Sequence, residues 1–294
     1  MRIYANSTGT IIFFVLKECK GNWSRKALNE LVFIGLGLFD EKDISLRGLE
    51  ELKEADTVFA EFYTSLMPRL SIQKLEEMTG KVVNVVSRRV LEEEEGQQLF
   101  EAAKKGKTAF LVQGDPMIAT THVGLRISAE KLGIKTRVIH GASVVSAVRG
   151  ISGLQNYKYG KAVTIPFSEK GFVSETPYNV IRDNKERGLH TMCYLDLKTE
   201  AERYLTINEA LKILLELEKR KKQQLITSRG LVIGVARAGS YEPLVKAGYL
   251  EELITYDFGA PPHTLIFPGK LHFMEAEALI ALAGAPKGVR EMAE

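Results

Sequence analysis

An apolar run that stops at a stiff tripeptide constrains the fold of this chain most strongly. Residues 109–112 are Ala-Phe-Leu-Val, and Gln113 leads into Gly114-Asp115-Pro116. A short continuous apolar run predicts a strand buried on both faces, as in a parallel sheet. Pro116 has a fixed φ and disfavours a helical Asp115, while Gly114 accepts backbone angles that a side chain forbids. We expect a rigid loop at the carboxyl end of a strand, where open α/β sheets bind ligands, although the tripeptide also fits an ordinary turn.

The first half of the chain repeats this alternation of apolar strands and amphipathic helices. Strands are expected at 31–34, 57–60, 82–86, 108–112 and 136–139. Ser45 predicts the cap of a helix whose apolar face includes Leu46, Leu49 and Leu52. Further helices are expected over 72–78, from the acidic run 92–95 to about Lys104, over 119–132, and around 144–148. The pattern predicts a parallel α/β sheet.

The first strand runs into a glycine loop that resembles half of a dinucleotide fingerprint. Gly35 and Gly37 have the G-x-G spacing, but Asp40 occupies the third glycine position and is followed by Glu41 and Asp43. A pyrophosphate at this helix start would meet three carboxylates instead of free amides. The loop therefore favours an uncharged or cationic ligand.

The polar stretch 152–160 separates a second set of strands and helices. Strands are expected at 162–166, 191–195, 231–236 and 264–267; Thr176 is expected to cap a helix, Thr206 and Glu209 form a capping box, and a closing helix spans 271–283. With 294 residues, 45% of them hydrophobic, the chain can fill two cores. We predict an extension over 1–30, an N-terminal α/β domain over 31–152 and a C-terminal α/β domain over 153–294.

Composition excludes several classes of function. A net charge of +3 with 26% charged residues calls for neither a nucleic-acid nor a membrane partner, and the basic run 219–222 fits a solvated helix end. Cys19 and Cys193 lie far apart, which favours a reducing cytoplasm over a disulfide framework. Five histidines without metal-ligand spacing argue against a metal site. The chain has neither a G-x-S-x-G elbow nor a Walker loop.

What remains for chemistry is a set of loops at strand ends. They are expected to gather ligand-binding groups at one edge of each sheet. They comprise 35–38, 114–118, 142–144, Asp196, 237–240 and 261–263.

Motifs in both halves resemble the diphthine synthase family, from about Leu31 to the C-terminus. They are 31–38, Ala60-Glu61-Phe62-Tyr63-Thr64-Ser65, Gly114-Asp115-Pro116 with 119–122, Pro261-Pro262-His263, and 268–272. This family belongs to the tetrapyrrole-methylase-like S-adenosylmethionine transferases. The resemblance implies two α/β domains of the tetrapyrrole methylase type, a cofactor cleft between them, and a homodimer. Residues 1–30 lie outside it.

The resemblance also implies a reaction. Its members methylate the amino group of a 3-amino-3-carboxypropyl histidine on elongation factor 2, and archaeal-type members add three methyl groups to give diphthine. S-adenosyl-L-methionine would be the cofactor and S-adenosyl-L-homocysteine the product. Because cation charge only moves from sulfur to nitrogen, positioning should dominate catalysis. The amine must be neutral to attack, yet no residue is predicted as the general base.

Residues of this chain that match the family's cofactor contacts are mostly apolar or contribute backbone. They are Leu38, Asp115, Ile118, Ser143, Val144, Leu195, Ala238 and His263. Asp115 could equally brace its own loop. Arg237 and Lys161 are candidates for the carboxylate of the substrate.

Three alternatives remain open at the level of sequence. A transferase of the same fold that acts on a precorrin-like tetrapyrrole shares Gly-Asp-Pro but should lack the 61–65 motif. An RNA-binding module would use the basic run 219–222 and bind in a salt-sensitive way. A dinucleotide-dependent oxidoreductase would bind NAD in preference to S-adenosylhomocysteine.

Overall fold

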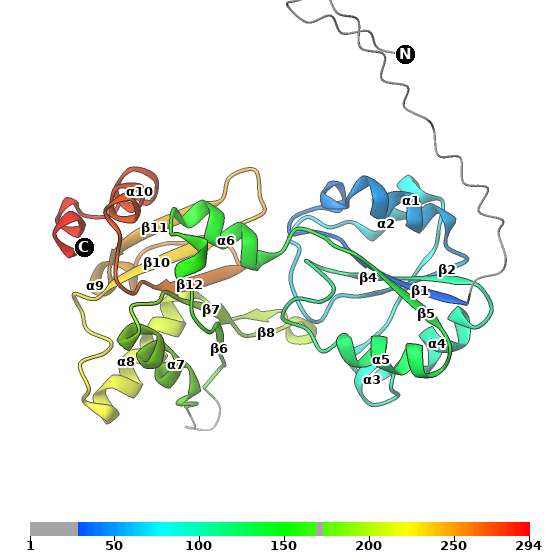
Figure 1. The fold of residues 1–294 in the computed structure, drawn as a ribbon, viewed down its shortest axis with the longest axis horizontal. Helices are drawn as coiled ribbons and strands as arrows, with labels where there is room; N and C mark the ends of the chain where they lie inside the picture. The colour runs from blue at the N-terminus through cyan, green and yellow to red at the C-terminus, as the bar shows by residue number, and fades with distance from the viewer. Residues whose placement is uncertain (1–28, 169–172) are drawn as a thin grey trace, which may run out of the picture.

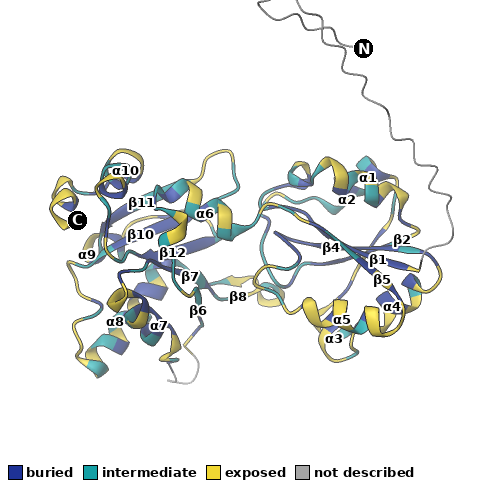
Figure 2. Cartoon of the chain, viewed as in Figure 1, coloured by how far each residue is buried: buried dark blue, intermediate teal, exposed yellow. Residues whose placement is uncertain are grey.

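Two five-stranded sheets lie side by side in the computed structural model, which describes residues 29–168 and 173–294 (Figure 1). Except for its last two residues, the predicted extension over 1–30 falls outside the described residues, as does Cys19. The central strands of both sheets are buried, and the helices that cover them expose their outer faces (Figure 2). The fold confirms the predicted α/β class.

The first sheet is entirely parallel and has the order β3-β2-β4-β1-β5. Its strands agree closely with the predicted ranges. They are β1 (Glu30–Gly35), β2 (Thr57–Glu61), β3 (Val83–Val85), β4 (Lys107–Val112) and β5 (Lys135–Ile139). Alternate residues of β1 enter two separate cores: Leu31 and Phe33 lie on one face of the sheet, and Val32 and Ile34 on the other. Full burial of a side chain such as Phe33 contributes about 1.5–3 kcal/mol.

Five helices cover the two faces of this sheet. The helices α1 (Leu46–Glu54) and α2 (Ile72–Thr79) lie on one face, and α3 (Arg88–Glu92), α4 (Gln97–Ala103) and α5 (Val123–Lys131) lie on the other (Figure 1). The Oγ atom of Ser45 caps α1 as predicted, by accepting from the Gly48 N–H. Leu46 is 80% exposed, so its predicted place on the apolar face is wrong.

Two helix boundaries in this half differ from the prediction. The acidic run does not begin one long helix, because Glu95 and Gly96 adopt positive φ angles of 53° and 70° and separate α3 from α4. The helix expected from residue 119 begins at Val123. Ala119 has a φ of 56°, and the Thr120 hydroxyl donates to the Pro116 carbonyl, which keeps this segment in the loop after β4.

The second sheet is mixed and has the order β11-β10-β12-β7-β6. Its strands are β6 (Val163–Ile165), β7 (Thr191–Leu195), β10 (Leu231–Ala236), β11 (Leu244–Tyr249) and β12 (His263–Phe267). Only β6 and β7 pair in parallel. The edge strand β11 has no counterpart in the prediction, and neither does the small hairpin of β8 (Leu197–Lys198) and β9 (Arg203–Tyr204).

Helices also cover both faces of the second sheet. The side chains of α7 (Thr176–Glu186) and α8 (Ile207–Lys221) pack in one core, and those of α6 (Val144–Ser152) and α10 (Phe273–Ala283) pack in the other. Helix α7 starts one residue earlier than predicted, with Glu175 at its N-cap. Shorter pieces are α9 (Leu250–Leu253) and the 3-10 turns η1 (Glu41–Asp43), η2 (Asn156–Lys158), η3 (Thr199–Ala201) and η4 (Lys287–Met292).

The chain passes from the first sheet to the second between β5 and α6. Val148 of α6 is fully buried in the same core as Met192 and Ile233 of the second sheet. The crossing therefore lies at residues 140–143. The predicted domain limits at 152 and 153 stay a prediction.

The long helix α8 accounts for the basic run 219–222. Thr206 and Glu209 form the predicted capping box at its start. At its end, the Lys221 Nζ lies 2.6 Å from Oε2 of Glu175, and the run complements the negative pole of the helix. None of the helices within residues 29–168 and 173–294 has both the length and the apolar character needed to cross a membrane.

Candidate active site

A cavity of about 540 Å³ lies between facing edges of the two sheets. From the first sheet it is lined by residues that follow the carboxyl ends of the parallel strands, including β1 and β4. From the second sheet it is lined by residues at the ends of β6, β7 and β10 and at the start of β12. The structure brings all eight predicted cofactor residues to this one cavity: Leu38, Asp115, Ile118, Ser143, Val144, Leu195, Ala238 and His263.

The first-sheet wall lies at a topological switch point. The strands β1 and β4 are neighbours, but the connection after β1 leads to β2 and the one after β4 leads to β5, on opposite sides. Loops that diverge in this way leave a crevice at the strand ends, which is where open α/β sheets bind ligands.

Four glycines bring the ends of β1, β4 and β5 into direct backbone contact. A Cβ at Gly35 would lie 2.6 Å from the Gly114 carbonyl oxygen, and one at Gly141 would lie 2.5 Å from the same oxygen. Gly114 also has a φ of 75° and pairs with Gly37 through two backbone hydrogen bonds of 2.6 and 3.3 Å. Only residues without a side chain fit this cluster. The cavity wall therefore presents bare backbone.

The carboxylates that argued against a dinucleotide site accept hydrogen bonds from backbone amides of their own loop. Asp43 Oδ2 accepts hydrogen bonds from the amides of Leu38 and Phe39, at 3.0 and 2.8 Å. Asp40 caps η1 by accepting from the Lys42 amide. These amides, which would have to hold a pyrophosphate, are already occupied.

Asp115 braces the loop in which it lies. Its Oδ1 accepts from the Met117 amide at 2.9 Å, and its Oδ2 lies 2.7 Å from Nδ1 of His140. Asp115 is buried, with 5% of its side chain exposed, whereas the side chain of His140 is largely exposed. Of the two roles that the sequence allowed, the brace is therefore present in the structure, at a residue that also lines the cavity.

His263 enters the opposite wall with both ring nitrogens engaged. Its Nδ1 accepts from the Ile207 amide at 3.4 Å, so the proton is on Nε2, which donates to the Gly259 carbonyl at 3.1 Å. Burial lowers the pKa of His263. It follows a cis Pro261-Pro262 bond. A neutral ring held in this way offers a ligand its face rather than a titrating nitrogen.

Arg237 and Lys161, the two cations suggested for a substrate carboxylate, are not among the residues that line the cavity, and their suggested role stays a prediction. Arg237 donates from Nη1 to the carbonyls of Phe258 and Ala260, at 2.9 and 2.5 Å. It thus fixes the segment before β12. Lys161 pairs through its backbone with the side chain of Asn184.

The loop after β2 is held from behind by a buried carboxylate. Oε2 of Glu61 accepts from the amides of Tyr63 and Thr64 at 3.0 and 3.1 Å, and the Thr64 hydroxyl donates to Oε1. Glu61 is fully buried, and desolvation raises its pKa. Tyr63 and Thr64 line the cavity.

His122 supports the neighbouring loop after β4. Its Nδ1 donates to the Pro116 carbonyl at 3.3 Å, and its Nε2 lies 3.8 Å from Oε1 of Glu61, too far for a hydrogen bond. Burial lowers the pKa of His122 to about 4, so the ring is neutral at pH 7. Glu61 and His122 thus lie next to each other, and each supports one of two loops that line the cavity.

Contacts across the cavity connect the two sheets directly. A Cβ at Gly239 would lie 2.3 Å from the Cβ of Leu38, so only glycine allows this approach. Beside it, the rings of Phe39 and Tyr241 pack edge to face with centroids 5.6 Å apart. These contacts fix the distance between the loop after β1 and the loop after β10.

Sequence reasoning missed two charged residues of the cavity, Arg88 and Glu92 of α3. Glu92 was assigned only to a helix terminus. The available signal was that both residues follow the strand β3, because residues beyond the carboxyl ends of parallel strands gather at one edge.

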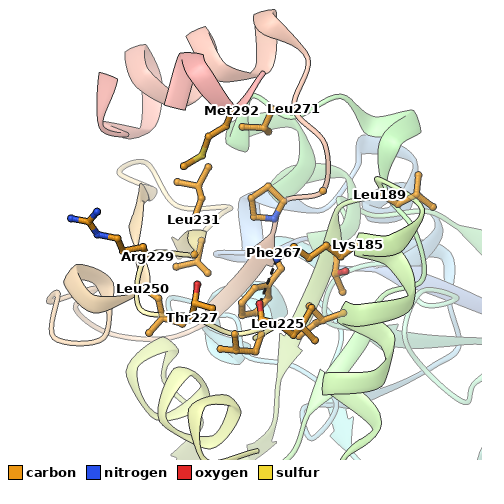
Figure 3. Close-up of a pocket in the computed structure, with 17 residues that line it drawn as sticks. Lys185, Leu189, Leu225, Thr227, Arg229, Leu231, Leu250, Phe267, Leu271 and Met292 are labelled. Carbon is orange, nitrogen blue, oxygen red and sulfur yellow. Dashed lines mark hydrogen bonds between the residues drawn. The ribbon is translucent and has the colours of Figure 1, made fainter. Parts of the chain in front are cut away.

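A second, smaller cavity of about 230 Å³ lies between α7, the segment 225–231 and the end of β12 (Figure 3). Its wall is mainly aliphatic, with the stem of Lys185 and with Arg229 at its edge. Among the described residues, the amine of Lys185 has one hydrogen-bond partner, the Leu225 carbonyl at 3.5 Å. None of the eight predicted residues lies there.

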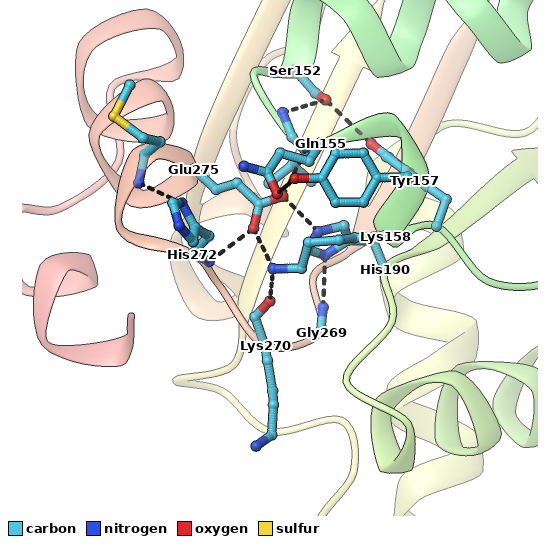
Figure 4. A network of polar contacts seen from close by, with 12 residues as sticks. Ser152, Gln155, Tyr157, Lys158, His190, Gly269, Lys270, His272 and Glu275 are labelled. Atoms are coloured by element: carbon cyan, nitrogen blue, oxygen red, sulfur yellow. Dashed lines mark hydrogen bonds and ion pairs between the residues drawn. The ribbon is translucent and has the colours of Figure 1, made fainter. Parts of the chain in front are cut away.

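A buried polar network surrounds Glu275, away from the larger cavity (Figure 4). Its Oε1 accepts from the Gln155 amide and from Nε2 of His190, and its Oε2 accepts from the His272 amide and from Nζ of Lys158, all within 2.9 Å. Nδ1 of His190 accepts from the Gly269 amide, which places the proton on Nε2. This carboxylate joins segments that are far apart in the sequence.

No group of three or more His, Cys, Asp or Glu side chains that could hold a metal ion occurs in the part of the chain that the structure describes. Cys193 is a free, buried thiol, and burial raises its pKa.

Comparisons with known proteins agree with this architecture. A family model described as "Tetrapyrrole (Corrin/Porphyrin) Methylases" matches residues 30–252. A diphthine synthase of Methanosarcina acetivorans is 51% identical over 269 residues, which cover 90% of this chain and 100% of that protein. One of Methanocaldococcus jannaschii is 49% identical over 251 residues, which cover 85% of this chain and 97% of that protein. A crystal structure of diphthine synthase matches with a TM-score of 0.81 and 42% identity, and covers 90% of this chain and 100% of that one.

Proposed function

Because this chain belongs to the tetrapyrrole methylases and, within them, to the diphthine synthases, we propose that it methylates the amino group of 3-amino-3-carboxypropyl histidine on elongation factor 2. The donor is S-adenosyl-L-methionine, and three transfers give diphthine. The observation that carries the proposal is the position of the eight predicted cofactor residues, which come from both sheets and all line one cavity.

The cavity suits this cofactor in size and chemistry. Its volume of about 540 Å³ lies within the range of small-molecule sites. Leu38, Ile118 and Leu195 offer apolar contacts for an adenosyl group, while Asp115 and Asp196 add one carboxylate from each side of the cavity. A carboxylate favours a nearby cation such as a sulfonium. Gly114 presents bare backbone, which lets a ligand approach closely. A Cβ at this position would have room, but the positive φ of 75° favours glycine over residues with a side chain.

Positioning is the main contribution that the protein makes to the reaction. When bound, S-adenosylmethionine supplies an electrophilic methyl group on a sulfonium. The loops after β2 and β4, which Glu61 and His122 hold from behind, form a stiff wall against which acceptor and donor are aligned. Contacts such as Leu38 with Gly239 narrow the cavity from the other side.

The precorrin alternative has less support. Relatives that are about half identical over essentially their whole length are named diphthine synthase. In the motif Glu61-Phe62-Tyr63-Thr64-Ser65, which a precorrin enzyme should lack, the last three residues line the cavity. The proposal also includes a homodimer, as the family resemblance implies, that acts in the cytoplasm.

We expect methylation of the protein acceptor but not of a tetrapyrrole. The enzyme is incubated with S-adenosylmethionine and either elongation factor 2 carrying the 3-amino-3-carboxypropyl histidine or a precorrin. Intact-mass spectrometry should show a gain of three methyl groups on the factor and none on the precorrin. A factor of unchanged mass together with a methylated precorrin would reverse the assignment.

Asp115→Arg is expected to weaken cofactor binding at least about 100-fold. The change removes the acceptor for the Met117 amide and puts a cation in the wall that would face the sulfonium. Calorimetry with S-adenosylmethionine measures the loss. Asp183→Arg, on the exposed side of α7, is the control and should bind as the wild type does. Equal affinity of all three proteins would remove Asp115 from the cofactor site.

A further inference from the structure

Arg88 is the one lysine or arginine, among the described residues, that lines the cavity between the sheets. The other charged side chains that line the cavity are the carboxylates of Glu92, Asp115 and Asp196. His263 is neutral, because burial lowers its pKa and its Nδ1 accepts a hydrogen bond from the Ile207 amide. An anionic group that enters this cavity therefore meets a single cationic partner.

The guanidinium of Arg88 rests on a fixed aromatic ring. Its Cζ lies 5.1 Å from the centroid of the Tyr63 ring, a cation–π contact that also limits the orientations of the guanidinium. Tyr63 is 7% exposed, and its amide is bonded to the buried Glu61 carboxylate. The Tyr63 ring that contacts Arg88 therefore belongs to a loop held in place by Glu61.

The nitrogens of Arg88 differ in their bonding from those of two other arginines. Arg137 uses Nε, Nη1 and Nη2 on the carboxylates of Glu30 and Glu51 at 2.6–3.0 Å, and Arg237 is bonded to two backbone carbonyls. Nε of Arg88 lies 3.7 Å from Oε1 of Glu92, beyond hydrogen-bond distance, and neither Nη has a hydrogen bond to a described residue. The N–H groups of the Arg88 guanidinium are therefore available to a ligand.

The acceptor of the proposed function carries the anion that such a guanidinium binds. In a 3-amino-3-carboxypropyl group, one carbon bears both the amine and a carboxylate, so a grip on the carboxylate fixes the position of the amine. A planar guanidinium matches a carboxylate through two parallel N–H···O bonds. A nearby cation also disfavours the protonated amine, which must lose a proton before it can attack.

We infer that Arg88 binds the carboxylate of the amino acid head group of the substrate and so determines which amines this enzyme methylates. This inference rests on the proposed function and adds a specificity-determining residue to it. Tyr63 and Glu61 act through Arg88: the Tyr63 ring orients the guanidinium, and the Glu61 carboxylate holds the loop that carries Tyr63.

Arg88→Gln should raise the KM for elongation factor 2 carrying the 3-amino-3-carboxypropyl histidine by roughly 10- to 100-fold, with a smaller fall in kcat. Arg88→Lys keeps the charge but loses the paired N–H donors of the guanidinium, so its KM should lie between those of the wild type and Arg88→Gln. Arg89→Gln is the matched control, because Arg89 carries the same charge on the same helix, is bridged to Glu94 and lies outside the cavity wall. Affinity for S-adenosylhomocysteine, measured by calorimetry, should be the same in all four proteins.

A pair of small molecules separates recognition of the carboxylate from docking of the large factor. An imidazole-bearing free α-amino acid with the same head group should inhibit the wild type at millimolar concentration, its primary carboxamide should not, and Arg88→Gln should not distinguish the two. Equal inhibition by both compounds, or by neither, contradicts the inference. An active wild type with Arg88→Gln equal to Arg89→Gln contradicts this inference alone, whereas an inactive wild type contradicts the proposed function as well.

Discussion

Gly141→Ala is expected to lower the rate of methyl transfer about 100-fold and the free energy of unfolding by about 2–3 kcal/mol. The new Cβ would lie 2.5 Å from the carbonyl oxygen of Gly114 and 2.8 Å from the carbonyl carbon of Gly35. Both are backbone atoms of neighbouring strand ends, so no side chain can rotate away. The loop that carries Asp115 and Ile118 must therefore shift, and with it one wall of the cavity.

Gly150→Ala is the matched control for this change. Gly150 lies in helix α6, is exposed, and has no atom within 4 Å of an added Cβ. Alanine in the interior of a helix is favoured over glycine by roughly 0.5–1 kcal/mol, so this variant should be as stable as the wild type or more so. Thermal unfolding, calorimetry with S-adenosylhomocysteine and the methylation rate report on both variants. A Gly141→Ala protein that melts and binds like the wild type would show that the three strand ends can separate at no cost.

Glu275→Gln is expected to lower the free energy of unfolding by about 3 kcal/mol. The carboxylate is fully buried and accepts four hydrogen bonds, one of them from the ammonium of Lys158. An amide would turn an NH2 group toward two of these donors and leave the Lys158 charge without its partner. Glu277→Gln, two residues further along α10 and paired with Arg290 on the surface, should change the melting temperature little.

The same carboxylate should make stability depend on pH in acid. Burial alone would raise the pKa of Glu275, but its hydrogen bonds from His272, Lys158, Gln155 and His190 outweigh burial and lower the pKa to about 2, from an ordinary value of 4.5. Between these two values the unfolded chain binds more protons than the folded one, so this contribution is complete above pH 4.5 and is lost as the pH falls toward 2. Denaturant unfolding from pH 7 to pH 3 should show a steeper loss for the wild type than for Glu275→Gln. Parallel curves would contradict the assignment.

The strands that were predictable from the sequence are those with strong local signals. The runs 31–34 and 108–112 are continuously apolar because helices cover both faces of the first sheet. The strand β11 was missed because its half-buried residues at the sheet edge lack such a run. The late start of α5 was missed because positive φ at Ala119 and the contacts of Thr120 and His122 with the Pro116 carbonyl depend on the folded loop.

The site was predictable as a set of strand-end loops, whereas its eight cofactor residues came from the family resemblance. Local sequence could not show how the long side chains are used. Arg237 was a reasonable candidate for an anion, but in the folded chain its Nη1 donates to the carbonyls of Phe258 and Ala260, and the residue does not line the cavity. Arg88, four residues before Glu92, has the spacing of an ordinary surface ion pair on a helix. Its place in the cavity wall depends on the tertiary structure.

Each five-stranded sheet is built from one uninterrupted stretch of sequence, and the backbone passes between them once, at residues 140–143. The width of the cavity therefore depends on how the two separately packed halves are oriented relative to each other, and the contact between Leu38 and Gly239 limits how closely they approach. Changes in that tilt would leave both hydrophobic interiors intact. A scaffold of this kind can adapt to acceptors of very different breadth through a few contact residues, without redesign of either half.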